Sequence, residues 1–427
     1  MKKSITVLAL AFFAASSFSL EVRMFSKHKE WAAGDTSFGI FATIYTDNQQ
    51  PQQIEPLQVL YVIDVSQGFT GNVRQEFING GIGLVQRLAD KDYFGIIIYS
   101  EYSRTLLPLS EIGFTGRDKI YSMLSEIRTE RGRDPLSALD KAVSEFSQND
   151  GRRNDGKSLV MTVLGETNED GEGNAYDKKM ISAMNRLGVQ VYTVGYGDDF
   201  NEDAAISVAE RTGGRAYFAG RDRTDLLKNR FTSLFAHITN PINTKNAEIE
   251  FLTRDGIKIT NFKENALNKI AIPKLVIGDT INLFFEVKNR PRKSSDIDID
   301  FDYENTAMRA NASGSASMRI NLARTNSSNF AERADKFIKY QLLFNLAKTI
   351  DELKIGDKTF RKDYADGFRQ MLQTRLGPVR NEINTREIQQ LFVDMVSLYD
   401  MIVGGTVSNG YIAKYVKYML HYCSYSE

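Results

Sequence analysis

The sequence is poor in cysteine and histidine. Cys423 is the only cysteine among 427 residues, so no intrachain disulfide can form, and no cysteine follows the amino-terminal segment to carry a lipid. The three histidines, His28, His237 and His421, lie far apart, and none has the spacing of zinc ligands. The sequence therefore predicts neither a disulfide scaffold nor a local zinc site.

The chain also lacks an excess of charge of either sign. It contains 54 Lys and Arg residues and 54 Asp and Glu residues, so no long-range field favours nucleic acid or an anionic membrane. Hydrophobic residues make up 42% of the chain and charged residues 25%, which is ordinary globular composition. We expect protein partners that are recognised through a local patch, and no nucleic acid.

No apolar run is long enough to cross a membrane core, which takes about 20 residues. The amino terminus instead has two lysines, an apolar run from Ile5 to Ala15, and then small residues. This order is typical of a secretory signal peptide. We expect residues 1–19 to direct export to the periplasm or the medium; the alternative, a retained anchor, would need a longer run.

The motifs of common enzyme families are missing as well. There is no phosphate-binding Walker loop and no Gly-x-Ser-x-Gly elbow, and Gly80-Gly81-Ile82-Gly83 lacks the preceding strand and the later glycine of a dinucleotide site. We therefore predict a protein that is not an enzyme. The enzymatic alternative needs a cleft of close titratable residues, which no sequence displays.

Residues 57–239 have the pattern of an α/β domain. Leu57–Val65 is a nearly unbroken apolar run that contains Asp64 close to its end, as expected of a strand buried on both faces. Further strand signals (93–99, 158–164, 189–195, 215–218) alternate with helix signals (77–88, 117–127, 135–146, 178–187, 204–211, 226–238), which predicts a doubly wound sheet. Ligands of such sheets bind beyond the carboxyl ends of the strands, so Asp64 is a candidate site residue.

The regions on either side follow other patterns. Short alternating apolar stretches over residues 240–306 predict an antiparallel β layer, and two strands within residues 20–56 are expected to join it, so that the α/β domain is an insertion. Residues 307–329 are rich in Ala, Ser and Asn and predict a polar linker. Helical periodicity over 330–353, 358–376 and 385–402 predicts a bundle over residues 330–405.

The last segment, residues 406–427, is rich in tyrosine. Its tyrosines recur at spacings of three and four, which places them along one face of a helix; they are Tyr411, Tyr415, Tyr418, Tyr422 and Tyr425. Because tyrosine is amphipathic and enriched at interfaces, the stripe is either a docking surface for a partner or a membrane surface, or a face that packs on the helical bundle.

Three stretches of the α/β region resemble motifs of the von Willebrand factor type A (vWA) family. The strand that ends in Asp64-Val65-Ser66-Gln67-Gly68 is similar to the family's Asp-x-Ser-x-Ser, with glycine in place of the last serine. Residues 132–142 resemble the family's Gly-Thr-Asn/Asp-Leu loop. Aligning the Ala-Leu pair puts Arg133 at the threonine, and a one-residue gap puts Asp134 there instead. Glu166 stands where the family's Thr-Asp-Gly has its aspartate.

The end of the domain carries the same resemblance. Residues 187–197 are similar to the family's last core strand, and residues 209–214 are similar to its Ala-x-x-Thr-Gly-Gly turn, so the resemblance extends from Gln58 to Ile238. The flanking β layer and helices resemble exported bacterial vWA proteins related to inter-alpha-trypsin inhibitor heavy chains. The resemblance implies a doubly wound vWA domain with an antiparallel β layer and a carboxyl-terminal bundle.

The resemblance also implies a binding site. In the family, the matching side chains hold a divalent cation whose shell is completed by a partner's carboxylate, and Asp64, Ser66 and Glu166 could still offer oxygens to Mg²⁺ or Ca²⁺. Two hydroxyl positions are lost, however, and an arginine near the site would repel a dication, so we expect a degenerate metal site. The loops with Ser66, Gly68, Arg133, Asp134 and Glu166 are then expected to hold a protein partner. The alternative is a structural or assembly component whose vWA domain binds no metal.

Overall fold

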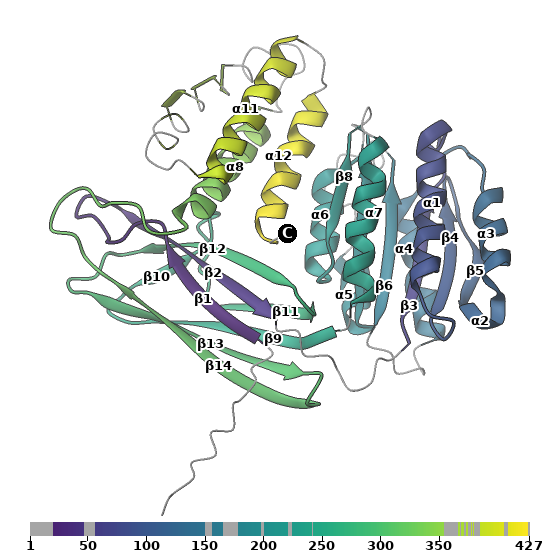
Figure 1. Ribbon diagram of the computed structural model, residues 1–427, viewed down its shortest axis with the longest axis horizontal. Helices are drawn as coiled ribbons and strands as arrows, with labels where there is room; N and C mark the ends of the chain where they lie inside the picture. The colour runs from purple at the N-terminus through teal and green to yellow at the C-terminus, as the bar shows by residue number, and fades with distance from the viewer. Residues whose placement is uncertain are drawn as a thin grey trace, which may run out of the picture.

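The computed structural model describes residues 20–46, 56–149, 156–164, 178–197, 200–220, 224–240, 242–353, 385–404 and 409–425, with short stretches between 366 and 379. Figure 1 shows three parts side by side, an α/β domain, a pair of β-sheets and a group of helices. The signal-peptide prediction for residues 1–19 lies outside the described residues.

The α/β domain is built on a six-stranded sheet in the order β5-β4-β3-β6-β7-β8 (Figure 1). Its strands are β3 (Gln58–Asp64), β4 (Tyr93–Tyr99), β5 (Ser103–Glu111), β6 (Lys157–Val163), β7 (Val189–Tyr196) and β8 (Ala216–Ala219). Neighbouring strands are parallel except β4 and β5. The strand order reverses between β3 and β6, and this is the point where doubly wound sheets bind their ligands.

Helices cover both faces of this sheet, which confirms the predicted fold class. One face packs against α1 (Gly71–Arg87), α3 (Arg117–Glu126) and α7 (Thr224–Thr239), and the other against α4 (Pro135–Gln148), α5 (Lys178–Arg186) and α6 (Glu202–Arg211). Strands β3, β6 and β7 are buried at every residue, as expected of parallel strands between two helical layers.

The edge strand β5 and the short helix α2 (Ile112–Thr115) were not among the predicted elements. β5 pairs with only one neighbour, and it carries a proline, Pro108, together with several partly exposed residues. Proline is tolerated in edge strands because one side of the strand has no hydrogen-bonding partner. The usual alternation of a half-buried strand is therefore weak here.

Two four-stranded antiparallel sheets form a β-sandwich where the sequence predicted a single β layer. One sheet has the order β1-β2-β12-β10 and the other the order β11-β9-β13-β14. The strands are β1 (Leu20–Ser26), β2 (Ser37–Thr46), β9 (Ile242–Thr253), β10 (Lys258–Thr260), β11 (Lys269–Val276), β12 (Thr280–Lys288), β13 (Ser295–Asn305) and β14 (Ala310–Ile320). β2 pairs with β12, so the α/β domain is inserted between strands of one sheet.

The predicted linker over residues 307–329 is wrong for its central part, because β14 runs from Ala310 to Ile320 and pairs with β13 along its whole length. Alanine, serine and glycine have low strand propensity, but pairing with a neighbouring strand outweighs such preferences. Gly314 has a packing role, since a Cβ there would lie 2.5 Å from the ring of Phe301 on β13. Small residues therefore let this edge strand fit against aromatic side chains.

The helices α8 (Ala334–Leu353), α11 (Arg386–Gly404) and α12 (Asn409–Cys423) share an apolar core. α8 also lies on the outer face of the first sheet, where Phe337 packs against Phe41 and Phe284. Gly39 on β2 makes room for this ring, because a Cβ there would come within 2.4 Å of Phe337. Most of the helix predicted over 358–376 lies outside the described residues.

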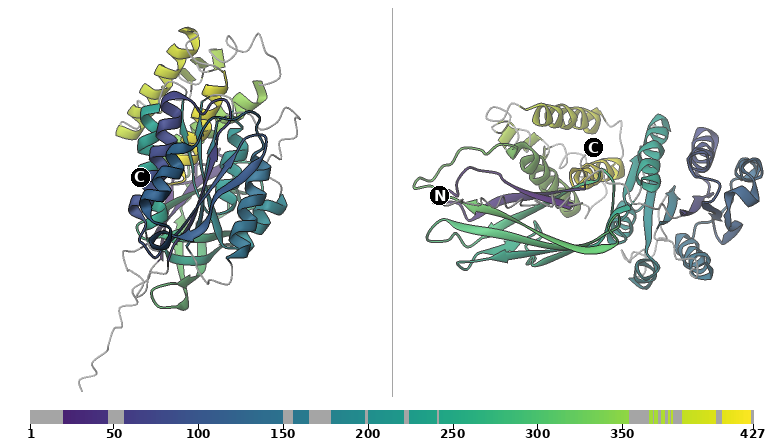
Figure 2. Two further views of the ribbon diagram at one scale, coloured as in Figure 1. Left: turned by 90° about the vertical axis from the view of Figure 1, so that its right-hand side faces the viewer. Right: turned by 60° about the horizontal axis from the view of Figure 1, so that its bottom comes forward.

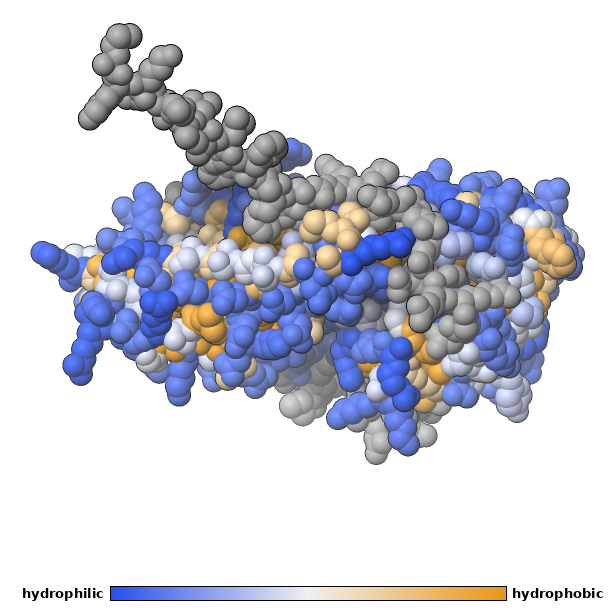
Figure 3. Space-filling model, turned by 90° about the horizontal axis from the view of Figure 1, so that it is seen from below, coloured by the Kyte–Doolittle hydropathy of each residue, from blue (hydrophilic) through white to orange (hydrophobic). Residues whose placement is uncertain are grey.

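α12 joins the helices to the α/β domain, since it packs on α8 on one side and on α6 and β8 on the other (Figures 1 and 2). The face of the molecule seen from below is largely hydrophilic, with hydrophobic residues in small separate groups (Figure 3). In the part of the chain that the structure describes, no helix is long and apolar enough to cross a membrane.

Candidate functional site

Three loops meet at the carboxyl edge of the α/β sheet, and we call residues 64–70, 99–102 and 127–134 the crest. Backbone hydrogen bonds tie the loops together. Val65 N donates to Tyr99 O (2.9 Å), Glu130 N to Val65 O (2.7 Å) and Glu101 N to Arg131 O (3.1 Å). The crest is therefore one ordered surface built from segments that lie up to about 70 residues apart in the sequence.

Asp64 lies at the centre of the crest, and its side chain is fully buried. Oδ1 accepts a hydrogen bond from Ser66 N and Oδ2 accepts one from Leu164 N, both at 2.9 Å. The hydroxyl of Tyr99 lies 3.2 Å from Oδ2, and the backbone N–H of Asp64 donates to Thr162 Oγ1 (3.0 Å). The carboxylate thus bridges the ends of β3 and β6, where the strand order reverses.

The surroundings act on this carboxyl in two directions. Burial raises the pKa of Asp64 above its ordinary value, whereas hydrogen bonds from Ser66 and Leu164 and the positive charge of Arg133 act to lower it. Burial outweighs the other effects, so the pKa of Asp64 is raised overall. Tyr99, Thr162 and Leu164 were absent from the predicted site, because only the pairing of distant strands brings them to Asp64.

Arg133 and Asp134, the two residues aligned with the family's threonine, have different surroundings in the loop before α4. Asp134 caps this helix, since its Oδ1 accepts a hydrogen bond from Ser137 N at 3.1 Å. Arg133 instead lies close enough to Asp64 for its charge to lower the pKa of that carboxyl. Asp134 therefore has a helix-capping role, and Arg133 contributes a positive charge near Asp64.

A glycine and a glutamate hold the 127–134 loop against its neighbour. Gly132 has φ +81°, and a Cβ there would lie 2.4 Å from the Cβ of Glu101, so both the backbone conformation and the close approach need glycine. Glu130 accepts hydrogen bonds from Arg104 Nη2 (2.5 Å) and Ser100 Oγ (2.9 Å). Burial acts to raise the pKa of Glu130, but the contacts with Arg104 and Ser100 hold that pKa below its ordinary value.

The described residues do not by themselves make a metal site. Ser66 is buried, and its hydroxyl lies near Asp64 without a hydrogen bond of normal geometry to any described residue, which would suit a ligand. Gly68 offers no side chain, however, and Arg133 brings a positive charge. No group of three or more His, Cys, Asp or Glu side chains within the described residues could hold a metal ion. The third predicted ligand, Glu166, lies outside those residues.

The outer surface of the crest is polar with one large aromatic side chain. Tyr102 is 75% exposed at the tip of the β4–β5 turn, which Ser100 N closes by donating to Tyr102 O (3.1 Å). Gln67, Gly68, Glu101 and Arg131 are exposed beside it. Tyrosine and arginine are the residue types most often found at the energetic centre of protein interfaces.

Comparison with known proteins agrees with this geometry. Residues 58–231 match the model of the von Willebrand factor type A domain family. The chain contains a vWA domain. No curated protein matches the chain.

The similarity to solved structures extends beyond the vWA domain to most of the chain. The ArnB paralog VWA2 from Sulfolobus acidocaldarius has a TM-score of 0.60 at 15% identity, over 95% of this chain and 99% of that chain. A von Willebrand factor type A protein from Catenulispora acidiphila has a TM-score of 0.59 at 12% identity, over 83% and 87%. The human COPII-coat protein Sec24c has a TM-score of 0.50 at 12% identity, over 89% and 60%. At these identities the likeness shows the fold alone.

The predicted tyrosine stripe packs inside the chain, against the vWA domain and the neighbouring helices. Tyr418 is 2% exposed and stacks on Phe218 of β8 with ring centroids 5.2 Å apart. Tyr411 lies against the same phenylalanine and over Gly220, where a Cβ would come within 2.4 Å of its ring. Tyr422 packs on Tyr217, and Tyr415 joins the core of the helices. The structure thus places the stripe in a packing role, the alternative to a docking surface.

Proposed function

We propose that this chain is an exported, non-enzymatic binding or scaffold protein that holds a protein partner with the crest of its vWA domain. The observation that carries the proposal is the combination of a rigid, hydrogen-bonded base and an exposed rim. Asp64 and Glu130 are held by backbone and side-chain hydrogen bonds, while Tyr102 and Arg131 are exposed above them. A pre-ordered surface with an aromatic residue and an arginine binds with little entropy loss.

Two further observations support a role without catalysis. Both carboxylate oxygens of Asp64 accept backbone N–H groups, so this buried acid is used to join two loops. The sequence has neither a Walker loop nor a Gly-x-Ser-x-Gly elbow. Export is supported by the lysines and the apolar run at the amino terminus.

A degenerate, metal-independent crest is the form of the proposal that the described residues favour. Arg133 places a positive charge near Asp64, and Gly68 lacks the hydroxyl that the family resemblance implies there. Isothermal titration with Mg²⁺, Ca²⁺ and Mn²⁺ tests this form. We expect no heat of binding from the native protein; heat that is lost in Asp64→Ala would show a working metal site.

Site-specific photo-crosslinking tests the binding surface itself. A photoreactive phenylalanine analogue replaces Tyr102 on the crest or, as the control, Phe114, which is 92% exposed on α2. In the exported fraction we expect one defined crosslinked product from position 102 and none from position 114. Equal products from both positions, or no product from position 102, would contradict the proposal.

The alternative is a structural or assembly component in which the vWA domain is a spacer. The packing of α12 on both the vWA domain and the other helices favours it, since the vWA domain is joined to a larger body. The same crosslinker at Met308, 52% exposed beside β14, separates the two ideas. Products from position 308 in place of position 102 would support the alternative. Kinship with inter-alpha-trypsin inhibitor heavy chains stays a prediction, because neither vWA protein named above is described as one.

A further inference from the structure

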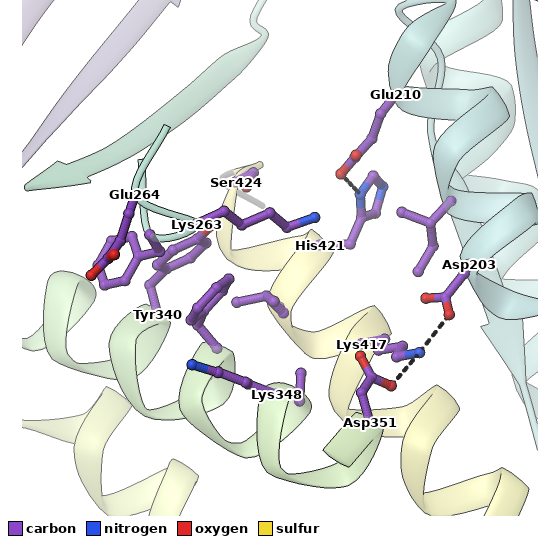
Figure 4. A pocket seen from close by; sticks show the side chains of 15 residues that line it. Asp203, Glu210, Lys263, Glu264, Tyr340, Lys348, Asp351, Lys417, His421 and Ser424 are labelled. Carbon is purple, nitrogen blue, oxygen red and sulfur yellow. Dashed lines mark hydrogen bonds and ion pairs between the residues drawn. The ribbon is translucent and has the colours of Figure 1, made fainter. Parts of the chain in front are cut away.

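The vWA domain meets the rest of the chain at a contact that we call the seam, formed by α6, β8 and the end of α7 on one side and by α12 and the β11–β12 turn on the other. A cavity of about 770 Å³ lies beside it, lined by residues of α6, α8, α12 and the loop 262–264. Figure 4 shows the charged side chains that face this cavity, with Lys417 between Asp203 and Asp351 and with His421 beside Glu210. Two of the three histidines of the chain, His237 and His421, lie at the seam.

His237 is held between a cation and an anion. Arg215 Nη1 contacts His237 Nε2, and Arg215 Nη2 donates to Asp279 Oδ1 on the β11–β12 turn at 2.6 Å. A guanidinium can only donate hydrogen bonds, so Nε2 must accept and the proton of the neutral ring lies on Nδ1. His237 Nδ1 in turn lies 3.4 Å from Asp279 Oδ1. This arrangement needs a neutral histidine.

One ring nitrogen of His421 on α12 also accepts a hydrogen bond. Its Nε2 accepts the backbone N–H of Ala216 on β8 (3.3 Å), and its Nδ1 lies 3.0 Å from Glu210 Oε1 on α6. Since a backbone N–H can only donate, Nε2 of His421 is the acceptor in the closed seam. Each seam histidine therefore uses one ring nitrogen to accept a bond that a second proton would abolish.

We propose that the seam is an acid-sensitive latch, in which protonation of His237 releases the vWA domain from the β-sandwich and α12. A proton on Nε2 would face the guanidinium of Arg215, and two cations would then share the single carboxylate of Asp279. The side chains of Arg215 and Asp279 are only 12% and 11% exposed, so water screens this repulsion weakly.

The other groups that face the two rings do not offset this effect. Among the described residues, Asp279 is the carboxylate that contacts the ring of His237. The ring of Tyr425 packs on the guanidinium of Arg215, with 4.4 Å between the ring centroid and Cζ. Near the ring of His421, the side chain of Lys263 points into the cavity toward the histidine and adds positive charge (Figure 4). The rings of Tyr422 and Tyr425 pack on His421 without adding charge at neutral pH.

The direction of the pH dependence follows from the environment of His237. Burial and the charge of Arg215 lower the pKa of His237 below its ordinary value of 6.5, although Asp279 acts to raise it. A histidine with a lowered pKa stabilises the closed seam above its ordinary pKa, and this contribution is lost as the pH falls. Below about pH 6.5 the ratio of open to closed molecules should rise by up to about tenfold per pH unit.

The covalent connections allow such a release. The vWA domain is joined to the β-sandwich only where the chain leaves β2 at Thr46 and where α7 leads into β9. The first connection is itself tied to the latch, because Thr46 N donates to the carbonyl of Asp279 (3.1 Å). Opening therefore breaks the contacts of the seam and needs no unfolding of either body.

Distance measurement between spin labels tests the latch in the full chain. Labels at Lys119→Cys on α3 and Lys293→Cys on the β12–β13 loop, both exposed positions, report across the seam in a Cys423→Ala background. We expect one narrow distribution of distances at pH 8 and a growing second population at other distances as the pH falls from 7 to 5. Circular dichroism at each pH verifies that both forms remain folded.

Three histidine variants make the test decisive. His237→Gln keeps an acceptor for Arg215 and a donor for Asp279 but cannot titrate, so it should stay closed throughout. His237→Lys should be open already at pH 8. His28→Gln, whose ring stacks on Phe330 away from the seam, should behave like the parent. An unchanged distance in the parent between pH 8 and 5, or the parent's pH profile in His237→Gln, would overturn the proposal.

Discussion

Tyr102 on the crest and Tyr418 at the seam are the same residue type in opposite surroundings. Tyr102 is 75% exposed at the tip of a turn, whereas Tyr418 is 2% exposed and stacks on Phe218. Charges differ in the same way. Arg131 is exposed on the crest, but Lys417 at the seam is 7% exposed and lies within 3.1 Å of three carboxylates.

The difference shows how exposure sets the role of a side chain. A buried tyrosine or lysine stabilises the contact between two parts of one chain, because its partners are already supplied. A tyrosine that is exposed on an ordered base provides contact area for a second molecule, and little entropy is lost when it binds. The sequence left the tyrosines of α12 either as a docking stripe or as a packed face, and it did not single out Tyr102.

The largest effect is expected from removing the buried ammonium of Lys417. In Lys417→Met, the carboxylate of Glu202, whose side chain is 7% exposed, would lose the ammonium that lies 3.1 Å away and keep that of Lys414 at 3.3 Å. Leaving a buried charge with fewer partners should lower the free energy of unfolding by about 3 kcal/mol. Urea denaturation measures this loss. Lys119→Met, at an exposed site on α3, should change stability by less than about 0.5 kcal/mol; a similar result for both variants would show that the seam charges contribute little.

A comparable loss is expected for Tyr418→Ala, which removes a ring packed between Phe200 and Phe218. Truncating a buried aromatic side chain costs about 3 kcal/mol through lost burial and the cavity that is left. The midpoint of thermal unfolding measures it. A loss below about 1 kcal/mol would contradict the packing role given to Tyr418.

The smallest effect on stability is expected for Tyr102→Ala, the matched change on the crest. Because its side chain is mostly in water, unfolding by urea should change by less than about 0.5 kcal/mol. The affinity for a partner, in contrast, should depend strongly on Tyr102. Once the crosslinked partner is known, Tyr102→Ala should weaken its binding by about tenfold or more, while Phe114→Ala should leave it unchanged. Equal binding by both variants would remove the distinction between crest and seam.

Many elements of the fold could be predicted from local patterns. The alternating strand and helix signals placed the vWA sheet and its helices, and the apolar run to Asp64 marked the strand whose end carries the site. β5 and β14 were missed, because a proline in one and small residues in the other hide the alternation of a strand. Both are edge strands that pair with a single neighbour, and that pairing is a tertiary contact.

The candidate site was predictable only in part. The family resemblance pointed to Asp64 and Arg133, but the partners of the carboxylate, Tyr99 and Leu164, come from other strands. The latch could not be predicted from the sequence, because Arg215, His237 and Asp279 follow no common spacing along the chain.

Hydrophobic periodicity is a local property, so the amino-acid sequence by itself determined the order of the elements, the buried strands of the vWA domain and the position of Asp64 at the end of one of them. Which charges meet, and which tyrosines face water, depends on how segments far apart in the chain pack together. The tertiary structure alone therefore decided that the tyrosines of α12 pack inside the chain, that Tyr102 is exposed on the crest, and that His237 lies between Arg215 and Asp279 at the seam.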